Sequence, residues 1–160
     1  MSPKHSAVPL ATLAAVVLAA CGGSSSTTLT RAELVSHADP ICKQVSTRRT
    51  AANEELRKAG ATSAKGLALL ARVAPGVAAY EHQAIDRLRT LKPPTTLTND
   101  WQQLLSGMQT LADDAGQIGE EAKAKKLKKI EAITSSGRSV RQQLTTIADR
   151  DGFVYCGRTS

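Results

Sequence analysis

From residue 30 onward, apolar residues recur at the three- and four-residue intervals of an amphipathic helix, with no convincing alternation of the kind that strands show. A capping box formed by Thr30 and Glu33 marks the start of the first helix, and Gly60 marks its end. Later starts fall at Thr62 or Ser63 and near Thr98. The pattern therefore predicts four long helices, over approximately residues 30–60, 62–92, 98–122 and 126–150.

Three places along this pattern leave the helix bounds open. Asp39-Pro40 resembles a second N-cap followed by proline, which predicts a short separate helix or a bend. Pro75-Gly76 predicts a kink inside the second helix. Residues 122–125 contain neither glycine nor proline, so the third and fourth helices could also be one long bent helix.

The N-terminal segment has a different pattern. A short basic start at Lys4 is followed by an apolar run over residues 7–20, which is typical of a secretory signal. The run is shorter than the roughly 20 residues that a membrane-spanning helix needs. It ends in Leu18-Ala19-Ala20-Cys21, which resembles the lipobox of bacterial lipoproteins.

That resemblance implies that residues 1–20 are removed as a signal peptide and that Cys21 carries fatty acyl chains such as palmitate. Residues 21–29, rich in glycine, serine and threonine, are then a flexible tether, and residues 30–160 form the folded domain. We expect a protein anchored by lipid on the extracytoplasmic face of the cell membrane. Two or more acyl chains give stable anchoring, whereas one binds only marginally.

The remaining cysteines are Cys42 and Cys156, and in an oxidising compartment they are expected to form a disulfide. Cys42 lies near the start of the first long helix and Cys156 follows the end of the last. These two points share one end of an antiparallel bundle only if the number of long helices is even. The fold expectation is therefore an all-α, antiparallel, up-down four-helix bundle closed by one disulfide.

Short motifs add a second resemblance. The chain reads Asp39-Pro40-Ile41-Cys42, then Leu91-Lys92-Pro93-Pro94, and Tyr155-Cys156-Gly157 near its end. Together with the lipobox, this arrangement resembles a group of uncharacterised actinobacterial exported helical lipoproteins, although Pro40 departs from their pattern. The resemblance implies no activity.

Charge restricts the partners. Lysine and arginine number 21 against 14 acidic residues, and aromatic residues make up only 2% of the chain. The positive charge favours anionic lipid or an anionic wall polymer, and an envelope protein is a further partner. The near absence of aromatic stacking surfaces argues against nucleic acid. The densest basic run, over residues 123–129, is either a solvated connection or a contact with such a polymer.

Several charged residues fall where the pattern expects core. Glu81 lies within the apolar stripe of the second helix, Arg48 or Arg49 interrupts the stripe of the first, and Arg141 borders that of the fourth. All lie at a similar depth from the disulfide end. One interpretation is a salt-bridge layer that sets helix register. The other is a polar pocket that presents arginine to an anionic ligand.

Candidate catalytic groups are few, and we expect no enzyme, no cofactor and no metal site. The alternative is an envelope-acting hydrolase with Glu81 and His82 as acid and base. A carrier of a small anionic or apolar ligand is the other alternative. The primary expectation is a non-enzymatic binding or structural module of the cell envelope.

Overall fold

The helices begin and end largely where the local signals place them. In the computed structural model, which describes residues 28–158, the Thr30 hydroxyl accepts the Glu33 N–H at 3.3 Å. The Glu33 carboxylate accepts the Thr30 N–H at 2.8 Å, so both bonds of the predicted capping box are present. The elements are α1 (Arg31–Ala59), α2 (Ala64–Arg89), η1 (Thr95–Leu97), α3 (Thr98–Lys123) and α4 (Leu127–Asp151).

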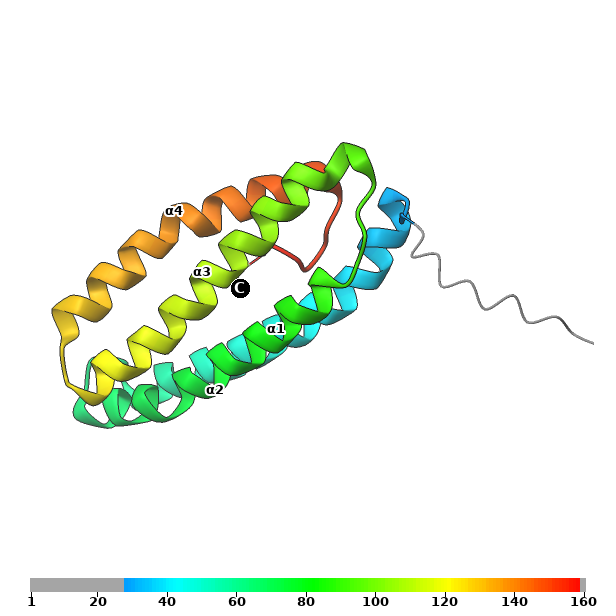
Figure 1. Cartoon of the computed structure of the whole chain (residues 1–160). Coiled ribbons are helices and arrows are strands. Elements are labelled where there is room, and N and C mark those ends of the chain that lie inside the picture. The colour runs from blue at the N-terminus through cyan, green and yellow to red at the C-terminus, as the bar shows by residue number, and fades with distance from the viewer. Residues whose placement is uncertain (1–27, 159–160) are drawn as a thin grey trace, which may run out of the picture.

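Neighbouring helices run antiparallel, which confirms the all-α, up-down four-helix bundle (Figure 1). No strand occurs in the described part of the chain. The third and fourth helices are separate and do not form one long bent helix. Lys125, between them, has a φ of 56°, which a continuous α-helix does not allow. The predicted signal peptide, Cys21 and most of the tether lie outside the described residues.

Of the two expectations at Asp39-Pro40, the short separate helix is wrong, and the bend stays a prediction. α1 continues through Pro40 as one helix. The Asp39 carboxylate instead accepts three backbone N–H groups of the C-terminal turn, from Val154 at 2.9 Å, Tyr155 at 3.0 Å and Cys156 at 3.2 Å. The side chain that resembled a local cap therefore binds a segment more than a hundred residues away. α2 continues through Pro75 as one helix, and the kink expected there stays a prediction.

The predicted disulfide joins Cys42 to Cys156, with the two Cα atoms 5.0 Å apart. The largest fully buried side chains lie in this half of the bundle, where the Trp101 and Phe153 rings stack with centroids 5.8 Å apart. They are Leu34, Ile85, Leu88, Leu104, Leu144, Phe153 and Cys156. None of the described helices is long and apolar enough to cross a bilayer.

The α1–α2 and α3–α4 connections lie at the opposite end of the bundle (Figure 1). This half is packed less completely, since a pocket lies among its helices. We call it the distal half. Seven of its larger apolar side chains are only half-buried: Leu56, Leu70, Val73, Val77, Ile118, Ile130 and Ile133. The core is thus concentrated at the disulfide end.

Candidate functional site

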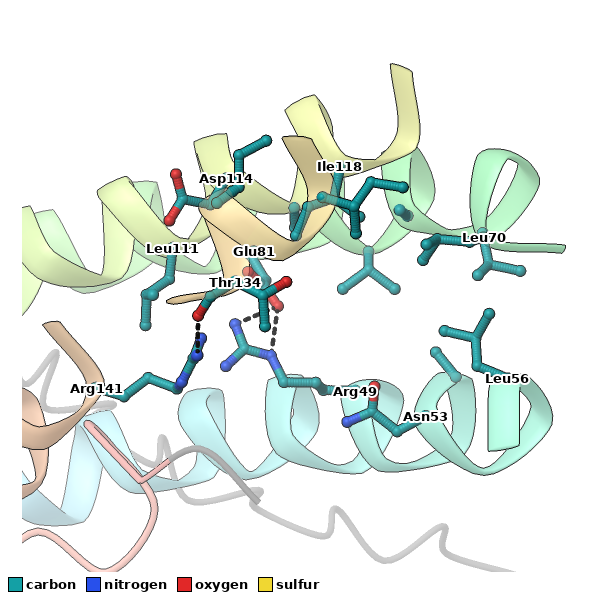
Figure 2. Close-up of a pocket in the computed structure, with 17 residues that line it drawn as sticks. Arg49, Asn53, Leu56, Leu70, Glu81, Leu111, Asp114, Ile118, Thr134 and Arg141 are labelled. Carbon is teal, nitrogen blue, oxygen red and sulfur yellow. Dashed lines mark hydrogen bonds and ion pairs between the residues drawn. The ribbon is translucent and has the colours of Figure 1, made fainter. Parts of the chain in front are cut away.

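A pocket of about 440 Å³ lies among the four helices in the distal half. Its volume falls within the roughly 300–1,000 Å³ typical of small-molecule sites. All four helices contribute to the lining, and the half-buried apolar residues of the distal half supply most of it (Figure 2). The polar residues of the lining are Arg49, Asn53, Glu81, Asp114, Thr134 and Arg141.

The pocket opens to solvent between α1 and α4. α2 packs closely against α1 and α3, and α3 packs against α4, but α1 and α4 have no comparable packing. The lining residues on these two helices include exposed positions, Asn53 on α1 and Thr134 on α4. A ligand could therefore enter from the side of the bundle without unfolding a helix.

The polar end of the pocket contains a buried ion pair. The Arg49 guanidinium donates to Glu81 Oε1 from Nε at 3.0 Å and from Nη2 at 2.8 Å. Glu81 is 3% exposed, and its Oε2 atom accepts no hydrogen bond within the described residues. Burial raises the pKa of Glu81, and the Arg49 charge opposes that rise. The pair links α1 to α2, as a register-setting salt bridge requires.

Arg141 occupies the same end without joining this pair. Its Nη2 donates to the Thr134 carbonyl oxygen at 3.0 Å, which directs the side chain back along α4 (Figure 2). Gly137 leaves room for it, because a Cβ atom there would lie 3.1 Å from Arg141 Nη1 and 3.2 Å from Asp114 Oδ2. Burial raises the pKa of Asp114, and the Arg141 charge lowers it. A larger residue at position 137 would thus displace the ends of the Arg141 and Asp114 side chains.

The structure decides between the two arginines that the sequence proposed. Arg49 holds Glu81, whereas Arg48 is exposed and lies over the Tyr80 ring at 4.0 Å from its centroid. Arg49, Glu81 and Arg141 therefore line one pocket, and Arg48 lies outside it.

Asp114 is the charged lining residue that sequence reasoning missed. It lies three residues after Leu111 and four before Ile118, on the apolar stripe of the third predicted helix. The criterion that singled out Glu81, an acidic residue within such a stripe, would have found it.

Glu81 and His82 are held by different partners, despite being adjacent in the sequence. The His82 Nε2 atom lies 3.2 Å from Asp113 Oδ1, and its Nδ1 atom lies 3.0 Å from Gln109 Nε2. This cluster is on the outer face of α2 and α3, whereas Glu81 faces Arg49 inside the bundle.

The described residues contain no group of three or more histidine, cysteine, aspartate or glutamate side chains that could hold a metal ion. The chain matches no protein-family model, and no curated protein or solved structure is significantly similar to it.

Proposed function

We propose that this protein is a non-enzymatic binding module of the cell envelope, anchored on the extracytoplasmic face of the membrane by acylated Cys21. It binds a small ligand in the pocket among its four helices. The lipobox at residues 18–21 supports the anchoring, and the pocket supports the binding.

One observation carries the binding proposal: apolar side chains that would complete the distal core instead line an open pocket. Water contact with these surfaces costs roughly 25 cal/mol per Å² of apolar area. A bound apolar group would remove that cost. At the polar end Arg49 and Glu81 hold one another, and the Arg141 guanidinium uses one donor on a backbone carbonyl, so a few charged groups are fixed in place as in a site that orients a ligand.

The hydrolase alternative has weaker geometric support. An acid and a base acting together must reach the same substrate atoms. The partners of Glu81 and His82 hold these two side chains in different surroundings. A hydrolase of this kind would lose its turnover of an envelope substrate in both Glu81→Gln and His82→Ala. Under our proposal there is no such turnover to lose, and His82→Ala, which lies outside the pocket lining, should retain ligand binding.

Anchoring is tested by Cys21→Ala. We expect the variant to leave the membrane fraction and to lack the mass of the acyl chains, as measured by fractionation and intact-mass spectrometry. A variant that stays in the membrane fraction would contradict the lipoprotein assignment.

Binding is tested by filling the pocket. Ala115 lies in the lining, so Ala115→Phe should remove most of the small molecules that co-purify with the wild-type protein, as measured by mass spectrometry of an organic extract. Ala79 is exposed on α2, and Ala79→Phe is the matched control. Equal yields from both variants would argue against the pocket as the binding site.

The distal end also suggests a polymer partner. The α1–α2 and α3–α4 connections lie together there (Figure 1), and exposed Lys58, Lys65, Lys125 and Lys128 surround them. We propose contact with an anionic wall polymer, since clustered positive charge attracts polyanions over about one Debye length. Replacing Lys125 and Lys128 by glutamate should weaken salt-sensitive binding to isolated anionic wall polymer. The same change at exposed Arg87 and Arg138 should not.

A further inference from the structure

We infer that the ligand of this pocket is an amphiphile with one apolar chain and an anionic head, and that the head binds Arg141. The inference rests on the proposed function and adds the chemical class of the ligand. Three observations support it. They are the distribution of polar and apolar lining residues, the partners of each charged group and the pocket volume.

The lining is divided along the bundle axis. Glu81, Asp114, Thr134 and Arg141 lie toward the disulfide end, and Leu56, Leu70 and Ile118 lie toward the distal end (Figure 2). Further apolar lining residues on α2 and α4 are Val73, Ile130 and Ile133. The polar Asn53 lies between Arg49 and Leu56 and is exposed, at the mouth of the pocket. A ligand that matches this division has one charged or polar end and one apolar end.

Arg141 is the group suited to an anionic head. The Arg49 guanidinium already donates twice to the Glu81 carboxylate. Among the residues described, Arg141 forms no such ion pair, and its hydrogen bond to the Thr134 carbonyl uses one of the five N–H groups of its guanidinium. The remaining N–H groups can bind a carboxylate or phosphate, which guanidinium groups often bind bidentately.

Two carboxylates could oppose an anionic head. Glu81 is neutralised by Arg49 and its oxygens are buried. Asp114 remains, because it lines the pocket beside Arg141. Removing the Asp114 charge should therefore strengthen the binding of an anion, whereas removing the Arg141 charge should weaken it.

The volume favours one chain over two. At about 440 Å³ the pocket lies near the lower end of the range for small-molecule sites. Fatty carboxylates and single-chain alkyl phosphates share the required chemistry. The two are separated by the choice of head group in the experiment below.

The full-length lipidated protein is placed in phosphatidylcholine vesicles and exposed to photoreactive long-chain probes that share one tail and differ in the head. The heads are carboxylate, phosphate, alcohol and trimethylammonium. We expect the carboxylate or the phosphate probe to label pocket peptides from α1–α4 with apparent affinity about tenfold above the trimethylammonium probe, the size of one charge-assisted hydrogen bond. The anionic head that binds more tightly shows whether the ligand is a fatty carboxylate or a single-chain alkyl phosphate.

The variants assign the head group to a residue. Arg141→Ala should lose the preference for anionic heads, Arg141→Lys should retain part of it, and Asp114→Asn should increase it. Arg138→Ala, an exposed arginine on the same helix, should leave it unchanged. Thermal unfolding of each variant shows whether the bundle is intact.

Two results would overturn the inference in distinguishable ways. Labelling of the pocket that is independent of the head, or unaffected in both Arg141 variants, rejects the anionic head and leaves the proposed binding function standing. The amphiphile is rejected as the ligand if none of the four probes labels pocket peptides and if any labelling elsewhere is unaffected by Ala115→Phe. If Ala115→Phe then also leaves the co-purifying molecules unchanged, the proposed function fails with it.

Discussion

At the scale of single residues, Glu81 is a buried carboxylate whose ion pair with Arg49 should contribute to stability. Glu81→Leu removes the acceptor of two Arg49 hydrogen bonds. Breaking one side of a buried pair typically costs about 3–5 kcal/mol. The Arg49 side chain is 21% exposed and can regain some hydration, so we expect about 3 kcal/mol. Chemical denaturation measures the loss, with exposed Glu120→Leu on α3 as the control. Equal midpoints for both variants would contradict the buried pair.

The same carboxylate predicts a pH dependence. Burial raises the pKa of Glu81 in the folded protein, so the folded state binds this proton more tightly than the unfolded state. The associated stability is fully present below the unfolded pKa, roughly 4.3, and is lost as the pH rises through the folded pKa. The unfolding free energy of wild type minus that of Glu81→Gln should therefore fall as the pH rises above about 4. A difference that rises with pH instead would show that Arg49 outweighs the burial.

At the scale of elements, the close approach of α2 and α3 depends on Gly119. A Cβ atom at Gly119 would lie 2.8 Å from Pro75 Cδ and 3.0 Å from its Cγ, so the two helices would have to separate. We expect Gly119→Ala to lower the unfolding free energy by about 1–3 kcal/mol. Gly76 has no atom within 4 Å of such a Cβ, so Gly76→Ala should raise it by up to about 1 kcal/mol through helix propensity. Urea denaturation of both variants measures the contrast, and stabilisation by both would refute the close approach.

At the scale of the whole molecule, the disulfide joins the first helix to the C-terminal turn that follows the last helix. Cys42 and Cys156 are 114 residues apart, and in the chain-entropy model a crosslink closing a loop of about 100 residues contributes on the order of 4–5 kcal/mol. Reduction should therefore lower the melting temperature of the wild-type protein. A double variant, Cys42→Ser with Cys156→Ser, should melt lower and be insensitive to reductant. A wild-type melting temperature unaffected by complete reduction, verified by intact mass, would count against this contribution.

The molecule is also asymmetric along its length. The core and the crosslink are at one end, and the incompletely packed pocket and the basic connections are at the other. Regions with fewer buried apolar contacts open at lower free-energy cost. Under the proposed function, a ligand would enter through the half of the bundle that opens at the lower free-energy cost.

Local patterns were sufficient for much of the fold. The period of the apolar residues, the capping box at Thr30 and the cap at Ser63 depend on side chains within a few positions of each other, and all are present. The disulfide was expected because two cysteines remain besides Cys21, and its pairing agrees with the even number of long helices. These features are local or topological, so the amino-acid sequence alone determines them.

Tertiary structure decided the rest. Asp39 has the local chemistry of a helix cap, but its partners are backbone N–H groups at the far end of the chain. Glu81 was correctly placed among buried positions, whereas the choice of Arg49 over Arg48 depended on which of two consecutive side chains faces α2. The pocket exists because α1 and α4 do not pack together in the distal half, although their apolar stripes resemble those of fully packed helices. A stripe specifies which face of a helix avoids water, but the distance between two facing helices follows from the volumes of all the side chains between them.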